Sequence, residues 1–83
     1  MKFEKLKEVK EIFASGLFTF DSRTMVDVNI MDGDQEYVRY ASIEQFLADN
    51  KFDNYYLFFD SENVDIFGLR INIWISKNRQ RGE

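Results

Sequence analysis

The chain has 83 residues, of which 45% are hydrophobic, and it carries a net charge of −4 with no cysteine and no histidine. A chain of this size forms one domain, whose core must supply stability without a disulfide or a thiolate metal site. The lack of imidazole and thiol removes the commonest general base and the thiol nucleophile. No apolar run approaches the roughly 18 residues of a membrane span. We expect a single cytoplasmic domain over residues 1–76, with a frayed, polar, basic tail at 77–83.

The acidic residues are concentrated in the middle of the chain. Residues 17–69 contain eleven Asp and Glu against three Lys and Arg, whereas basic residues lie mainly at the two ends. Direct binding to nucleic acid requires a basic patch on the folded body. We therefore expect no direct nucleic-acid binding, and the simplest role of the acids is to keep an aromatic-rich domain in solution.

The N-terminal segment predicts an amphipathic helix over residues 2–15. In a short helix such an apolar stripe more often covers the protein's own sheet than a partner, and we expect the former. The apolar residues recur at spacings of three and four, which place them on one helical face: Phe3, Leu6, Val9, Ile12 and Phe13.

Two extended segments follow the helix. Residues 17–20 form a short apolar run that indicates a strand, and polar residues at 21–23 end it. The next segment alternates with period two and predicts a second strand. Its core face carries Thr24, Val26, Val28 and Ile30, and its other face carries Met25, Asp27, Asn29 and Met31.

Asp32–Gly33 predicts the turn of a β-hairpin that leads into a third strand. A two-residue loop would place Val26 opposite Arg39 and so bring a charge onto the core face. A three-residue loop over Met31–Gly33, with the glycine left-handed, places Val26 opposite Val38. We prefer the three-residue loop, because it keeps apolar residues together.

Ser42 predicts the start of a second helix by the capping-box rule. Its hydroxyl can accept a hydrogen bond from the Gln45 amide, and the Gln45 side chain can reach back. We expect this helix to end near Asn50. Its apolar stripe consists of Ile43, Phe46 and Leu47.

The stretch from Asn54 to Ser76 carries more apolar surface than any other. Tyr55–Phe59 is dense in aromatic residues and shows no alternation, which is typical of a strand covered on both faces, and we expect it to be the most buried strand. From Leu69 to Ser76 the alternation is strict and predicts another strand. Its core face holds Leu69, Ile71, Ile73 and Ile75.

The phase of the apolar pattern changes at Phe67–Gly68, and two structures explain the change. Residues 63–75 form one long strand with a bulge at Gly68, or Phe67–Gly68 is a tight turn that places Asp65 opposite Arg70. Phe67 tolerates the positive φ of a primed turn poorly, so we favour the bulged strand.

Together these elements predict an α+β fold in the order α-β-β-β-α-β-β. We expect a mostly antiparallel sheet of four to five strands, with the two short helices packed on one face.

Carboxylates are the remaining candidates for catalysis or metal binding. Asp27 and Asp65 lie inside predicted strands, but their spacing does not bring them together, and each is explained as a solvated strand residue. The acids near Gly33 do not fit an EF-hand, because counting from Asp27 puts Asp32 at position six and Val38 at position twelve. The four glycines are isolated, so no phosphate loop is expected. We expect a non-enzymatic protein with no cofactor and no metal site.

A binding surface is the remaining source of function. The sheet face opposite the helices would carry Tyr37 and Trp74 together with Met and Arg side chains, a composition enriched at protein interfaces. Such a face could also pair with itself in a homodimer, which gives the alternative of a structural homo-oligomer or accessory subunit. A stacking platform for single-stranded nucleic acid would need a basic groove in addition. The predicted face comprises Met25, Asp27, Asn29, Met31, Tyr37, Arg39, Arg70, Asn72 and Trp74.

In size, acidity and lack of catalytic side chains, the chain resembles the small inhibitors that phages and mobile elements use against host nucleases, including anti-CRISPR and anti-restriction proteins. The resemblance is one of composition. It implies a protein partner with a basic surface, such as a cleft that normally holds nucleic acid and that carboxylates on adjacent loop tips could occupy. Our leading hypothesis is a small acidic protein-binding module of this kind. The candidate carboxylates are Asp32, Asp34, Glu36, Asp60, Glu62 and Asp65.

Overall fold

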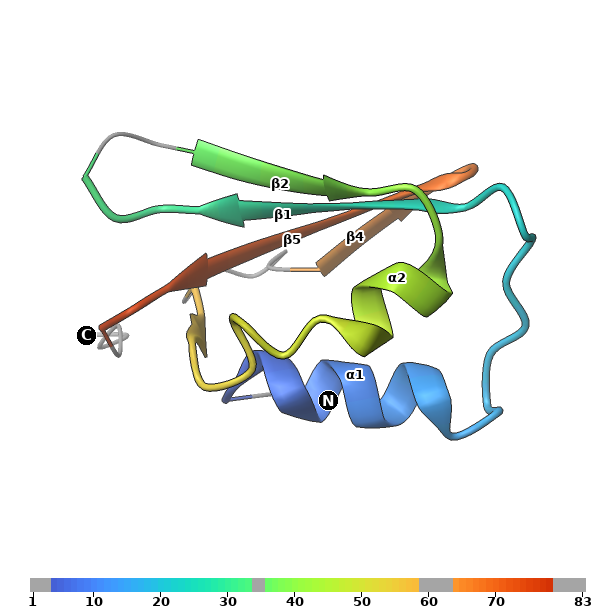
Figure 1. Cartoon of the computed structure of the whole chain (residues 1–83), viewed down its shortest axis with the longest axis horizontal. Coiled ribbons are helices and arrows are strands. Elements are labelled where there is room, and N and C mark those ends of the chain that lie inside the picture. The colour runs from blue at the N-terminus through green and yellow to red at the C-terminus, as the bar shows by residue number, and fades with distance from the viewer. Residues whose placement is uncertain (1–3, 34–35, 59–63, 79–83) are drawn as a thin grey trace.

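The computed structural model describes residues 4–33, 36–58 and 64–78, and over these ranges the chain has an α+β fold (Figure 1). A mostly antiparallel sheet of five described strands carries both helices on one face, so the predicted fold class is confirmed. Neither helix of these ranges has the length and hydrophobicity that crossing a bilayer requires. In chain order the elements are α1 (Leu6–Ala14), β1 (Met25–Ile30), β2 (Glu36–Tyr40), α2 (Ile43–Ala48), β3 (Tyr56–Leu57), β4 (Val64–Phe67) and β5 (Arg70–Ser76).

The helix α1 follows the predicted apolar stripe but starts later than expected. Its first turn is closed by Glu8, whose carboxylate accepts a hydrogen bond from the Lys5 amide at 3.0 Å. Phe3, the first residue of the predicted stripe, lies outside the described residues. The buried residues of the stripe are Leu6, Val9 and Phe13.

The strands β1 and β5 form the centre of the sheet and run parallel to each other. The strand order is β2-β1-β5-β3, and β4 pairs with β5 along the edge that β1 leaves free. Burying an aliphatic side chain of this size stabilises a fold by about 1.5–3 kcal/mol. The core faces predicted for both strands are confirmed except at Leu69, which lies in the turn before β5 and is 41% exposed. Five side chains of the two strands are 0% exposed: Val26, Val28, Ile71, Ile73 and Ile75.

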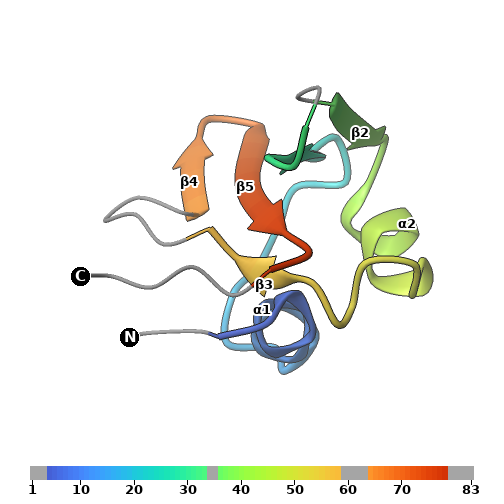
Figure 2. The same ribbon diagram turned by 90° about the vertical axis from the view of Figure 1, so that its left-hand side faces the viewer.

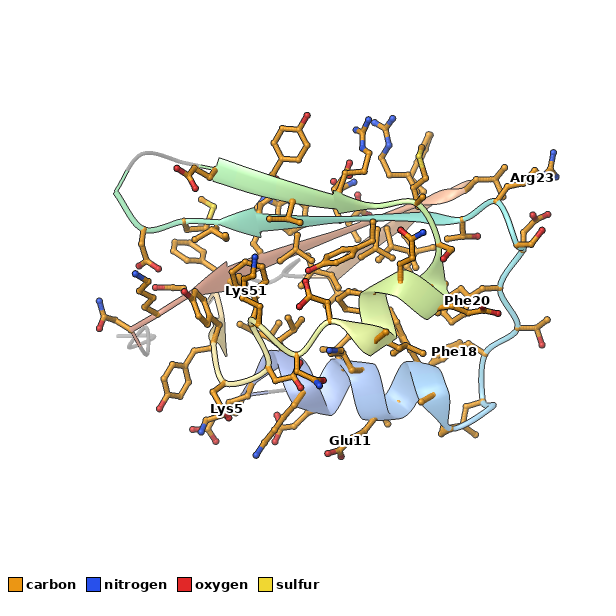
Figure 3. The ribbon with its side chains drawn as sticks, in the orientation of Figure 1. Lys5, Glu11, Phe18, Phe20, Arg23 and Lys51 are labelled. Atoms are coloured by element: carbon orange, nitrogen blue, oxygen red, sulfur yellow. The ribbon has the colours of Figure 1, made fainter. Side chains whose placement is uncertain are left out.

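Residues 17–20 do not form the predicted strand, and residues 64–76 form two strands instead of one, so the order of elements is α-β-β-α-β-β-β. Both edges of β1 are occupied by β2 and β5, which leaves no place beside it for a further strand. The loop instead carries Phe18 and Phe20 against Phe13 of α1, with ring centroids 6.3 and 5.0 Å apart. Figure 3 shows both rings beside the ends of the two helices. Ring packing thus takes the place of strand pairing in this segment.

The prediction that Tyr55–Phe59 is the most buried strand is wrong. Only Tyr56–Leu57 is a strand, and this strand, β3, lies at an edge of the sheet beside β5. Its backbone also bonds to the segment before α1, because the Leu57 amide donates to the Glu4 carbonyl at 2.9 Å. Phe59 lies outside the described residues. The aromatic run therefore connects the segment before the first helix to the sheet edge, and only Leu57 of its strand residues is buried in the core.

The hairpin between β1 and β2 has a longer loop than predicted. Val38 pairs with Val28, and not with Val26 as the three-residue loop requires. The connection spans residues 31–35, and Gly33 has the expected left-handed conformation at φ +58°. A shift of two residues keeps every side chain on its own face of the sheet, so the predicted faces of both strands are retained.

The phase change near Gly68 is a tight hairpin, and the bulged strand favoured from the sequence is wrong. Phe67 pairs with Arg70, so the turn falls on Gly68 and Leu69, one residue later than in the predicted alternative. The positive φ of +60° is taken by Gly68, as in a type II′ turn, and not by Phe67. The steric objection to a turn applies only when the turn includes Phe67.

The helix α2 begins at the predicted N-cap. Ser42 Oγ accepts a hydrogen bond from the Gln45 amide at 3.2 Å. The Gln45 side chain reaches back to the Ala41 amide at 3.2 Å, one residue before the partner that a capping box provides. The helix ends at Ala48, close to the expected position, and buries Phe46 at 1% exposure.

Candidate functional site

Both helices lie on one side of the sheet (Figures 1 and 2), and the described elements leave the other side open. We call this side the outer face. Val26, Val28 and Ile73 point into the core, so their neighbours along the strands point away from it. The assignment agrees with the face predicted from the sequence, except that Met31 follows the end of β1 and that Asp65 and Phe67 of β4 also belong to the face. The outer face consists of Met25, Asp27, Asn29, Tyr37, Arg39, Asp65, Phe67, Arg70, Asn72 and Trp74.

The strand registers arrange the outer face into three rows that run across the sheet. Neighbouring strands are about 4.8 Å apart, so side chains in one row can contact each other. The middle row crosses four strands, from Arg39 on β2 through Asp27 on β1 and Asn72 on β5 to Asp65 on β4. The row on one side of it consists of Tyr37, Asn29 and Trp74, and the row on the other side of Met25, Arg70 and Phe67.

Asp27 organises the charges of the outer face. It is not the solvated strand residue expected from the sequence, because its side chain is only 8% exposed. Its carboxylate accepts hydrogen bonds from Arg39 Nε at 2.7 Å and Arg39 Nη2 at 3.1 Å. Arg70 Nε lies 3.8 Å from the same carboxylate. The Arg39 hydrogen bonds hold the pKa of Asp27 below its usual value, against the opposing effect of burial. One buried carboxylate therefore positions two guanidinium groups whose side chains remain 44% and 50% exposed.

Two aromatic side chains of the outer face are largely exposed. Tyr37 is 61% exposed and Phe67 is 81% exposed. They lie on β2 and β4, which are at opposite edges of the sheet. The Arg39 guanidinium carbon lies 5.8 Å from the centroid of the Tyr37 ring, within the range of a cation–π contact. Trp74, the single tryptophan of the chain, is half-buried between them. Rings and arginines of this kind are the groups that most often anchor protein interfaces.

Comparisons of the chain with protein-family models, curated proteins and solved structures give no match. The function must therefore be inferred from the site itself. Over residues 4–33, 36–58 and 64–78, no three or more acidic side chains are grouped closely enough to hold a metal ion. The chemistry that the outer face offers is recognition, through ion pairs to Arg39 and Arg70 and through contact with exposed rings.

Among the described partner-binding carboxylates predicted from the sequence, Asp32 and Glu36 line one pocket, whereas Asp65 lies apart from them on the outer face. Asp32 accepts hydrogen bonds from Ser76 Oγ at 2.7 Å and from the Lys77 amide at 2.6 Å, which connect the β1–β2 loop to the end of β5. These bonds hold the pKa of Asp32 below its usual value. Glu36 is exposed at the start of β2 on the helix side of the sheet, whereas Asp65 is exposed on the outer face. Asp34, Asp60 and Glu62 lie outside the described residues.

A second polar cluster lies on the helix side, and the sequence reading did not identify it. Lys10 is 6% exposed, and its Nζ atom donates to Asp53 Oδ1 at 2.6 Å and to the Asp49 carbonyl. The Tyr40 hydroxyl donates to Asp49 Oδ2 at 2.7 Å. The cluster joins α1, β2 and the segment after α2, and its polar groups satisfy each other. We assign it to stability.

Asp65 and Phe67 are the members of the outer face that the sequence prediction missed. The bulged-strand interpretation placed no turn after Phe67, and so no strand β4 that would present it beside Arg70. A glycine at the first loop position of a two-residue hairpin is a recognised signal. Placing Gly68 and Leu69 in the loop would have paired Phe67 with Arg70 and found both on this face.

Proposed function

We propose that this chain is a non-enzymatic protein-binding module whose contact surface is the outer face of the sheet. The observation that carries the proposal is the pair of arginines held by one buried carboxylate, with Arg39 contacting the exposed ring of Tyr37. A guanidinium fixed by an internal ion pair loses little side-chain entropy on binding. The outer face therefore combines preorganised charge with exposed ring surface.

The charge balance of the outer face favours a protein over a nucleic acid as its ligand. Arg39 and Arg70 are offset by Asp27 and Asp65, so the face has no net charge. Binding to a phosphate backbone depends on an excess of basic residues. A face with both charges and with aromatic rings corresponds to a protein interface.

The proposal is tested by affinity capture with variants of the two sides of the sheet. The outer-face variant carries Tyr37→Ala with Phe67→Asp, and the control variant carries Leu17→Asp, on a residue that is 73% exposed outside the outer face. We expect specifically retained protein, including tagged copies of this chain, to be lost with the outer-face variant and kept with the control. The opposite pattern would assign binding to the helix side and overturn the proposal.

The inhibitor hypothesis is a second candidate, and the charge distribution supports it. The acidic segment 17–69 accounts for more than the whole net charge of −4, and Glu36 and Asp65 are exposed. In this candidate, the carboxylates occupy a basic cleft of a nucleic-acid enzyme, as in anti-CRISPR and anti-restriction inhibitors. Asp34→Lys with Glu62→Lys should then weaken binding to a captured partner and reduce its salt dependence. Unchanged affinity and salt dependence would remove the mimicry hypothesis and leave the outer-face proposal intact.

A further inference from the structure

We propose that the partner of the outer face is a second copy of this chain, and that two outer faces pack against each other in a symmetric dimer. This inference rests on the proposed function and names its partner. It is drawn from the charge pattern of the outer face and from the order of its residues across the strands.

The outer face differs from the rest of the chain in its net charge. The face contains two basic and two acidic side chains, so the net charge of −4 belongs entirely to the remainder of the molecule. Two copies repel each other through any other surface that shares this negative excess. The outer face is neutral, and both signs of charge on it are partly exposed. Association between identical copies is therefore least opposed there.

The order of charges in the middle row makes the outer face complementary to itself. Arg39 lies at the β2 end of the row and Asp65 at the β4 end, four strands across. A two-fold axis along the strands, over the space between β1 and β5, places β2 of one copy over β4 of the other. Arg39 then faces Asp65 of the partner subunit, and the same pair recurs on the other side of the axis. Each interface thus contains two equivalent ion pairs, as an isologous dimer requires.

The same axis also places an amide beside an aromatic ring in one of the flanking rows. It brings Asn29 on β1 over Trp74 of the partner subunit on β5, which sets an amide against an indole near the centre of the interface. The strands of the two sheets keep a common direction, which is the aligned mode of sheet packing with a layer spacing of about 10 Å. Asp27 stays paired with Arg39 of its own chain, so no buried carboxylate loses its partner.

Sedimentation equilibrium of matched charge variants tests the dimer. Asp65→Lys replaces both intersubunit attractions with repulsions, and the exposed position of Asp65 leaves the fold unaffected. Glu11→Lys makes the same charge change on α1, where Figure 3 shows Glu11 pointing away from the sheet. Asp65→Glu keeps the charge. Circular dichroism spectra of all variants should match the parent spectrum.

We expect the parent, Asp65→Glu and Glu11→Lys chains to reach about twice the 10.0 kDa chain mass with rising concentration. Asp65→Lys should raise the dimer Kd at least tenfold, and a mixture of Asp65→Lys with the parent should give an intermediate Kd, because one of two pairs survives. A parent that stays monomeric at all concentrations would overturn the dimer, as would a dimer that Asp65→Lys does not weaken. Either result leaves the capture experiment to decide whether the outer face binds another protein.

Discussion

The two faces of one sheet, built from alternate residues of the same strands, have opposite properties. On the helix side Ile71 and Ile73 are fully buried, whereas their neighbours Arg70 and Asn72 lie on the outer face among exposed rings. The helix side therefore supplies the burial on which the stability of a small domain depends. The outer face contributes little buried apolar surface to the fold. Its one buried charge, the Asp27 carboxylate, forms ion pairs with Arg39 and Arg70. Stability is thus concentrated on the helix side, and we propose that recognition is confined to the outer face.

The largest expected effect is on the helix side. Ile73→Ala should lower the free energy of unfolding by about 3–4 kcal/mol, because it removes a fully buried side chain and leaves a cavity in the centre of the core. Asn72→Ala, one residue earlier on the outer face, should cost less than about 1 kcal/mol. Urea denaturation of the two variants measures both values. Similar losses of unfolding free energy for the two variants would show that stability does not depend mainly on the helix side.

Asp27→Asn should have an intermediate effect, since it removes the one buried charge of the outer face. At pH 7 we expect a loss of about 1–2 kcal/mol from weakened bonds to Arg39. The pKa of Asp27 is lowered in the folded state, so its stabilisation is present above the unfolded pKa of about 3.9 and is lost as the pH falls through the folded value. The difference between parent and variant should shrink below about pH 4 in urea titrations. A difference that stays constant down to pH 2 would contradict the ion pair.

The smallest effect is expected for a single hydroxyl group. Tyr40→Phe should cost about 1 kcal/mol at pH 7, because the Tyr40 hydroxyl donates to Asp49 on the helix side. Burial, followed by this hydrogen bond, raises the pKa of Tyr40, so its contribution is present below the unfolded pKa of about 10 and declines above it. Tyr37→Phe on the outer face is the matched control, with an expected change close to zero in thermal unfolding of dilute protein. Equal shifts for both tyrosines would contradict the assignment.

Periodicity was sufficient to predict the strands and faces that the core depends on. The alternation of β1 and β5 identified Val28 and Ile73 as core residues and Asn29 and Trp74 as outer-face residues, because a strand with one buried side must alternate. The Ser42 cap was also found, since its hydrogen bond to Gln45 is local in sequence.

The features that could not be predicted depend on contacts between distant segments. The aromatic run at 55–58 resembles a central strand in composition, but its position is decided by backbone bonds to the segment before α1 and to Trp74. The parallel pairing of β1 with β5 joins residues more than 40 positions apart and has no local signal. The two-arginine cluster follows from that pairing, because it brings Arg70 to Asp27 from the neighbouring strand.

The most direct test of the outer face as the contact surface is acrylamide quenching of Trp74 fluorescence. Trp74 is the single tryptophan of the chain, it lies on the outer face, and it is half-buried in one copy. If outer faces pack together, the quenching constant should fall as concentration rises through the dimerisation range, and should not change for Asp65→Lys over the same range. A quenching constant that stays the same while the parent chain dimerises would place the contact on another surface and contradict the account.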